Sequence, residues 1–180
     1  MPKDDTALPN NIFIGIGSNV GDRLSHLSWA VKRLGLFDEL VLHRMSSVYE
    51  SEAHTLEGSE NQDAYLNAVV WLQGDISPVR MLELCMALEL ERGRARQEGM
   101  EWEPRTLDLD ILAFDELRLM TTFLTIPHPR LSERKFVLAP WNEIAPGFIV
   151  PAPFGETVAE LLTKCEDFAG LEKTPFQLLD

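Results

Sequence analysis

EPRTLDLDILAF, residues 103–114, combines the pattern of a buried strand with two carboxylates. Successive side chains of a strand point to opposite faces of its sheet. One face is therefore predicted to carry Asp108, Asp110, Leu112 and Phe114, and the other Leu107, Leu109, Ile111 and Ala113. The second face is apolar throughout. The first changes from acidic to apolar, as at a strand end that opens into a cleft.

The segments around this stretch alternate between strand and helix patterns. Runs rich in β-branched and aromatic residues predict strands at residues 11–18, 40–51 and 64–74. Apolar residues at helical spacing predict helices at residues 22–35, 77–93, 132–143 and 157–165. Ser77 followed by Pro78 is a typical helix start, because serine caps the first turn and proline suits the first helical position.

The order strand, helix, strand, strand, helix, strand predicts an α+β fold. We expect a ferredoxin-like core with a mostly antiparallel sheet, followed by additional C-terminal helices. A chain of 180 residues is long enough for one domain with a sizeable core. The expected organisation is a flexible leader at residues 1–10, a single domain at 11–165 and a C-terminal tail at 166–180.

Composition excludes several classes of function. The net charge of −13 argues against a general nucleic-acid-binding surface. No apolar run in the sequence reaches the roughly 20 residues that a membrane span needs. Cys85 and Cys165 lack the spacing of a metal or redox motif, and the first residues lack an apolar signal region. We therefore expect a cytoplasmic protein with reduced thiols that binds neither nucleic acid nor membrane.

The basic residues are unevenly distributed in this acidic chain. Eight of the sixteen Lys and Arg residues lie between Arg92 and Lys135. A local group of arginines suits a small phosphorylated anion better than a polymer. The alternative is a solvated face on which the arginines balance nearby glutamates.

Asp108 and Asp110 are predicted to stand about 6.6 Å apart, from two strand rises of about 3.3 Å. Mg²⁺ takes oxygen ligands and commonly uses one or two carboxylates with substrate phosphates. Two such carboxylates suit a pair of ions roughly 3.5–4 Å apart. The alternative is a structural salt bridge to an arginine such as Arg105. Phosphoryl chemistry is favoured by the donors on flanking segments, which are Arg94, Arg96, Arg105, His128, Arg130 and Arg134.

Three other segments have a candidate role. GIGSNVGD, residues 15–22, fits neither the dinucleotide fingerprint nor the Walker loop, and is interpreted as a strand-to-helix turn capped by Asn19 or Asp22. Tyr65 and Asn67 share a strand face, where they either hold a flat heterocycle or pack across strands. The long connection 94–106, with its exposed tryptophan, is expected to act as a lid.

Four segments together resemble the 6-hydroxymethyl-7,8-dihydropterin pyrophosphokinase family of folate biosynthesis. They are YLNAVV (65–70), ELERGRARQ (89–97), WEPRTLDLDIL (102–112) and IPHPRLSERKFVLAPWNEIAP (126–146). The resemblance implies an enzyme that transfers the diphosphate of ATP to the pterin hydroxymethyl group and leaves AMP. Two rival hypotheses remain, namely another two-metal phosphohydrolase or nucleotidyltransferase, and a binding module whose aspartates form salt bridges.

The resemblance also implies residue roles and a monomeric enzyme. Two Mg²⁺ ions would be bound by Asp108 and Asp110. The transferring phosphates would be contacted by Arg94, Arg96 and Arg105. ATP would be bound by Glu89, Trp102, Ile111, Thr125, His128 and Arg134. The pterin would be held by Tyr65, Asn67 and Phe136.

Overall fold

The computed structural model of the protein describes residues 9–52, 63–93 and 105–179. Within these ranges one sheet runs through the molecule, and all its strand pairs are antiparallel. Its strands lie in the order β5 (Asp108–Phe114), β1 (Asn10–Ser18), β4 (Tyr65–Gly74), β3 (Tyr49–Ser51) and β8 (Leu171–Lys173), and β2 (Leu40–Met45) also pairs with β4. The prediction of a mixed fold with an antiparallel sheet is confirmed.

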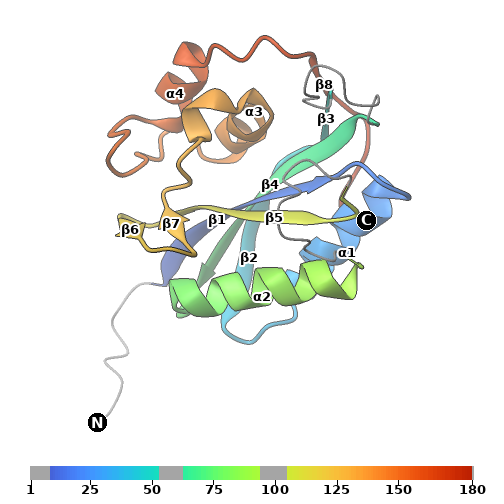
Figure 1. Cartoon of the computed structure of the whole chain (residues 1–180), viewed down its shortest axis with the longest axis horizontal. Coiled ribbons are helices and arrows are strands. Elements are labelled where there is room, and N and C mark those ends of the chain that lie inside the picture. The colour runs from blue at the N-terminus through green and yellow to red at the C-terminus, as the bar shows by residue number, and fades with distance from the viewer. Residues whose placement is uncertain (1–8, 53–62, 94–104, 180) are drawn as a thin grey trace.

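Helices cover both faces of this sheet (Figure 1). One face is covered by α1 (Arg23–Leu34) and α2 (Pro78–Glu91), and the other by α3 (Lys135–Ile144) with α4 (Val158–Lys164) packed against it. Between β5 and α3 lie a hairpin of β6 (Leu119–Met120) and β7 (Thr125–Ile126) and the 3₁₀ turn η1 (Leu131–Glu133). Each face has its own buried core, so the sheet separates two hydrophobic layers.

The helices begin where the sequence places their polar caps. The Asp22 carboxylate accepts a hydrogen bond from the Ser25 amide at 3.1 Å, and the Ser77 hydroxyl accepts one from the Arg80 amide at 3.1 Å. Thr157 caps α4 in the same way. The helix expected at 132–143 is divided into η1 and α3, because Arg134 between them has non-helical backbone angles.

The strand expected at 40–51 is divided, so that prediction is wrong in its continuity. The Ser46 hydroxyl, instead of a main-chain carbonyl, accepts the Val69 amide hydrogen at 2.9 Å. The Ser46 amide still donates to the Val69 carbonyl at 2.9 Å. A serine that competes with the backbone as acceptor interrupts the ladder, and β2 ends before β3 begins.

The predicted alternation along the acidic strand holds up to Leu112 and fails beyond it. Ile111 and Ala113 pair with consecutive residues of β1, so Leu112 is the extra residue of a β-bulge. Leu112 and Ala113 consequently both lie in the core beside α3, and Phe114 lies in the core beneath α1 and α2. The expectation that Phe114 shares a face with the carboxylates, and Ala113 the opposite one, is wrong.

The two chain ends contribute more to the described fold than their sequence suggests. Asn10, placed in the expected leader, is the first residue of β1 and donates a hydrogen bond to the Gly74 carbonyl at 3.3 Å. The expected C-terminal tail contains β8, and Leu178 is only 4% exposed within the core. In the ranges described, no helix combines the length and apolar character that crossing a membrane requires.

Candidate active site

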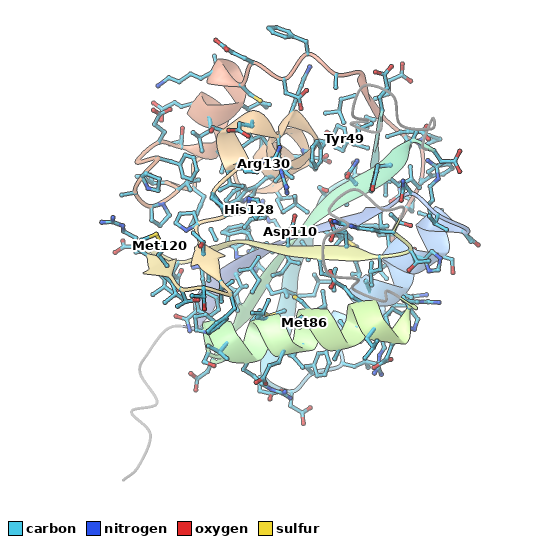
Figure 2. All side chains as sticks on the ribbon, viewed as in Figure 1. Tyr49, Met86, Asp110, Met120, His128 and Arg130 are labelled. Carbon is cyan, nitrogen blue, oxygen red and sulfur yellow. The ribbon has the colours of Figure 1, made fainter. Side chains whose placement is uncertain are left out.

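Asp108 and Asp110 lie at the start of β5, on the same strand face as Leu112 and therefore on the side of the sheet that α3 covers. Figure 2 shows Asp110 on this side. Across the ladder they pair with Gly17 and Gly15 of β1. Because glycine has no side chain, β1 places no side chain of its own against either carboxylate. A Cβ atom would lie 3.3 Å from Leu112 Cδ2 at Gly15 and 3.4 Å from Asn67 Oδ1 at Gly17, so neighbouring side chains cover both glycines. The two side chains are 21% and 33% exposed, so solvent or a ligand can reach them.

Each carboxylate is paired with an arginine. Arg105 Nη1 donates to Asp108 Oδ2 at 3.0 Å, and Arg134 Nη1 donates to Asp110 Oδ2 at 2.8 Å. Burial alone would lower the pKa of Arg105, but the charge and hydrogen bond of Asp108 outweigh it, and the pKa is raised. The salt bridges considered as the alternative to a metal site are therefore present in the structure.

Arg105 is positioned through its backbone by the turn after β1. The Arg105 amide donates to Asn19 Oδ1 at 2.6 Å, and the Asn19 amide donates to the Arg105 carbonyl at 3.0 Å. One residue further on, the Thr106 hydroxyl donates to the Arg92 carbonyl at 2.7 Å, at the end of α2. The segment that leads into β5 is thus hydrogen-bonded to both the end of α2 and the β1–α1 turn.

His128 and Arg134 reach the site from the turn between β7 and α3. The His128 amide donates to the Leu112 carbonyl at 2.9 Å, which fixes this turn against β5. His128 Nε2 lies 4.0 Å from Asp110 Oδ2, and both side chains lie on the α3 side of the sheet in Figure 2. Burial is the main reason that the pKa of His128 is lowered. Asp110 acts against this shift, and the positive charges of Arg134 and Arg130 add to it.

The residues expected to hold a pterin are joined to the carboxylates through the sheet. Gly17 pairs with Asp108 on one side and with Asn67 on the other, so the three residues form a row across β5, β1 and β4. Asn67 Nδ2 donates to the Ser51 hydroxyl at 2.9 Å, which orients the amide of this 6% exposed residue. Tyr65 lies two residues earlier on the same strand face, as the sequence predicted.

Phe136 lies at the start of α3, above the same face of the sheet. It packs at the edge of the core that α3 and α4 share, and the Arg134 guanidinium lies 5.8 Å from its ring centroid. Arg134 therefore stands between the expected aromatic wall of the pterin pocket and Asp110.

Of three further residues with an expected ATP contact, two are buried and the third lies in the hairpin before His128. Ile111 is 5% exposed and belongs to the core on the α1–α2 side, opposite the carboxylates. Glu89 is 2% exposed, and its carboxylate accepts a hydrogen bond from the Leu109 amide of β5 at 2.8 Å. Thr125 lies in β7 of the hairpin, three residues before His128, and is half-buried.

The remaining expected contacts, Arg94, Arg96 and Trp102, lie outside the described residues, as does most of the expected lid. Within the described ranges no group of three or more His, Cys, Asp or Glu side chains is arranged to hold a metal ion. Two partly exposed carboxylates on one strand face fit a different kind of site, in which Mg²⁺ takes one or two protein oxygens and completes its shell with phosphates and water.

Two residues of the site were missed by the sequence reasoning. Asn19 was considered only as a helix cap, whereas Asp22 is the cap and Asn19 holds Arg105. Ser51 was part of a predicted strand without a role, and it orients Asn67. Both contacts join segments that are far apart in sequence, so no local pattern signals them.

A family model described as 7,8-dihydro-6-hydroxymethylpterin-pyrophosphokinase (HPPK) matches residues 13–146. This range covers well over half of the chain and contains both carboxylates, Arg105, His128 and Arg134. The chain belongs to the HPPK family. The resemblance seen in the sequence is confirmed.

Relatives of this HPPK chain support the assignment. A 2-amino-4-hydroxy-6-hydroxymethyldihydropteridine pyrophosphokinase from Bacillus subtilis is 38% identical over 165 residues, which cover 91% of this chain and 96% of the relative. The enzyme of that name from Pseudomonas aeruginosa is 34% identical over 164 residues, with coverage of 91% and 96%.

Solved structures support the fold of this HPPK chain. The crystal structure of wild-type Plasmodium falciparum HPPK-DHPS with pteroate matches with a TM-score of 0.65, covering 88% of this chain at 14% identity. This chain spans 43% of the length of that solved chain. At so low an identity the likeness concerns the fold alone.

Proposed function

We propose that the protein transfers the diphosphate of ATP to the hydroxymethyl group of 6-hydroxymethyl-7,8-dihydropterin, releasing AMP, as a step of folate biosynthesis. Membership of the HPPK family and the names of its relatives support this activity. The structural observation that carries the proposal is the pair Asp108 and Asp110 on an open sheet face, surrounded by Arg105, His128 and Arg134.

Asp108 and Asp110 are proposed to bind two Mg²⁺ ions. Their carboxylates are hard oxygen ligands on one strand face, and both are partly exposed, so hydrated ions and phosphates can reach them. When bound, such ions neutralise charge on the phosphates and polarise the bond that breaks. The protein contributes the fixed spacing of the two carboxylates along β5.

Arg105 and Arg134 are proposed to bind the phosphates of ATP, with His128 and Thr125 on the same side. A guanidinium offers several donors in a planar fork, which matches phosphate oxygens. Glu89 and Ile111 are buried, so their proposed part is indirect: they hold β5 in place from the opposite side of the sheet. The sequence resemblance adds contacts from Arg94, Arg96 and Trp102.

Tyr65, Asn67 and Phe136 are proposed to hold the pterin. Asn67 has its amide oriented by Ser51, and the two aromatic side chains suit a flat ring. Asn67 and Asp108 are separated by two strand spacings, about 10 Å in all. A pterin beside Asn67 would therefore place its hydroxymethyl group toward phosphates held at the carboxylates.

Catalysis in this arrangement depends on positioning and charge stabilisation. The acceptor hydroxyl and the β-phosphorus would be brought together on one sheet face, which removes the entropic cost of their encounter. Arg105, held by its backbone, would meet the charge that develops on the transferring group. No covalent intermediate with a protein side chain is needed.

The proposal also covers the arrangement of the core, the oligomeric state and the location in the cell. The antiparallel order β5–β1–β4, flanked by α1 and α2 on one face, supports a ferredoxin-like arrangement of the core. A monomeric enzyme is part of the proposal. Cys85 and Cys165 are both free, which supports a cytoplasmic location.

Product analysis tests this function. The protein is incubated with ATP, Mg²⁺ and the hydroxymethyl dihydropterin, and AMP is measured with and without the pterin. We expect AMP to form only when ATP, Mg²⁺ and the pterin are all present. Release of inorganic phosphate or pyrophosphate without pterin would instead favour a hydrolase, and no turnover would favour a binding module.

A further inference from the structure

The two proposed metal ligands are already occupied by positive charge. Arg105 Nη1 lies 3.0 Å from Asp108 Oδ2, and Arg134 Nη1 lies 2.8 Å from Asp110 Oδ2. The four side chains are between 20% and 33% exposed, so both pairs are shielded more than ordinary surface pairs. A carboxylate oxygen that accepts a hydrogen bond from a guanidinium is a poorer ligand for a cation, and the two positive charges would repel each other.

We propose that Arg105 and Arg134 take the place of the metal ions in the nucleotide-free protein and move to phosphate oxygens when ATP binds. This inference rests on the function proposed above. The two arginines neutralise the two carboxylates. Metal ions added without nucleotide would leave the site with excess positive charge. The negative phosphates of ATP neutralise this charge, because they bind both the ions and the arginines.

The geometry allows the exchange to involve side chains alone. Arg105 is fastened by two backbone hydrogen bonds to Asn19, so its guanidinium can turn while its main chain stays in place. The Arg134 amide donates to the Leu131 carbonyl at 3.2 Å, and its guanidinium lies between Asp110 and the Phe136 ring. Each guanidinium is therefore tethered within reach of its carboxylate and, because both ion pairs are partly exposed, of a phosphate that binds beside it.

The exchange predicts that metal and nucleotide bind with positive coupling. Without nucleotide, a metal ion must displace an arginine from its ion pair, and no phosphate takes up the displaced guanidinium. With nucleotide, the phosphates accept the arginine and also ligate the ion. By linkage, each ligand then strengthens binding of the other by the same factor.

Titration of the nucleotide-free protein with Mn²⁺ tests the proposal. Mn²⁺ takes the same oxygen ligands as Mg²⁺, and its free concentration can be followed by electron paramagnetic resonance. We expect Arg134→Ala and Arg105→Ala each to tighten Mn²⁺ binding about five-fold, as loss of a partly exposed competing ion pair implies. Arg130→Ala is the matched control, because Arg130 also lies near His128 but forms its ion pair with Glu133 at 3.2 Å. That variant should change the affinity less than about two-fold, since its charge acts through solvent.

A second substitution locates the metal. Adding Asp110→Asn to Arg134→Ala should abolish the gain in Mn²⁺ affinity, and circular dichroism should verify that each variant is folded. Unchanged affinity in both Arg134→Ala and Arg105→Ala would overturn the proposal, as would an equal gain in Arg130→Ala. If Arg134→Ala does not fold, Arg105→Ala decides the question at Asp108. The titration uses no pterin and no turnover, so its outcome is separate from the test of the proposed function.

Discussion

Asn19 and Arg105 are joined by two hydrogen bonds between segments that are 86 residues apart in sequence. The Arg105 amide donates to Asn19 Oδ1 at 2.6 Å, and the Asn19 amide donates to the Arg105 carbonyl at 3.0 Å. Asn19 is only 1% exposed, so water cannot replace its side-chain oxygen without rearrangement. The turn after β1 therefore sets the position from which Arg105 reaches Asp108.

Asn19→Ala should lower kcat at least about ten-fold, because small displacements of a catalytic group are costly. The variant should also lose about 1–3 kcal/mol of stability, since the buried Arg105 amide loses its acceptor. Asn19→Asp keeps an oxygen at the same place and should recover part of kcat. Steady-state kinetics and chemical unfolding measure both effects. Lost stability with normal kcat would show that Asn19 has a structural role alone.

Asp108→Asn and Asp110→Asn should each lower kcat at least about 100-fold, because a carboxamide is a poor ligand for a hard cation and carries no charge. The strand keeps its shape, so each variant should fold, and loss of its ion pair with Arg105 or Arg134 should lower the free energy of unfolding by about 1 kcal/mol. Asp115→Asn, just beyond the other end of β5, is the matched control and should retain activity, since the Asp115 carboxylate accepts a hydrogen bond from Asn11 Nδ2 at 2.8 Å. Turnover within a few-fold of wild type in either site variant would refute the metal assignment.

Gly17→Ala should fold normally and bind the pterin poorly. A methyl group there would lie 3.4 Å from Asn67 Oδ1 and 3.9 Å from Tyr65 Cδ1, which are ordinary contacts. The free energy of unfolding should therefore change by less than about 1 kcal/mol. The methyl group fills the space between Asp108 and Asn67, so KM for the pterin should rise while KM for ATP changes less. Gly147→Ala, with no atom within 4 Å of the added carbon, serves as control. Equal KM values in the two variants would argue against a pterin on this face.

Glu143 of α3 should make stability depend on acidic pH. Burial raises its pKa, but hydrogen bonds from Ser47, Lys173 and Tyr49 outweigh burial, and the net pKa is lowered from 4.5. A lowered folded-state pKa means that the stabilisation is present above the ordinary value and is lost as pH falls through the lowered one. Glu143→Gln should therefore flatten the loss of stability below about pH 5, as thermal unfolding can measure. Glu83→Gln, at the exposed pair with Arg80, should leave the curve unchanged.

Tyr49 should make stability depend on alkaline pH. Burial and the Glu143 carboxylate, which its hydroxyl contacts at 3.1 Å, raise the pKa of Tyr49 from 10.0 to about 12. The stabilisation is therefore present below pH 10.0 and is lost as pH rises toward about 12. Tyr49→Phe should reduce the steepness of this alkaline loss. An identical alkaline curve for the variant would contradict the assignment.

The sequence predicted those parts of the fold that depend on local pattern. Asp22 and Ser77 cap helices as expected, because capping involves residues within one turn. Alternation placed Asp108 and Asp110 on one face, since strand geometry determines it. It failed at Phe114, because a bulge depends on how β5 fits β1 rather than on its own residues. Ser46 interrupted a predicted strand for a similar reason, since its partner Val69 belongs to another strand.

The candidate site was predictable in its residue types and less so in its contacts. The sequence predicted that Asp108 and Asp110 share a strand face and offered Arg105 as an ion-pair partner, and the structure has both. The partner of Asp110, Arg134, is 24 residues away and reaches it only through the turn before α3. The hydrogen bonds between Asn19 and Arg105 likewise form only once β5 is paired with β1 in the folded sheet. Contacts of this kind follow from tertiary packing, which a single sequence does not reveal.

The most direct test follows the phosphorus atoms of ATP. The protein is incubated with Mg²⁺, the hydroxymethyl dihydropterin and ATP that is isotopically labelled at both the β- and γ-phosphates. The products are separated, and their masses are measured by mass spectrometry. If the protein is a pyrophosphokinase, one pterin product should carry both labels and unlabelled AMP should form in equal amount. A pterin that carries the γ label alone, with ADP as the second product, would contradict diphosphate transfer, as would labelled pyrophosphate released without pterin.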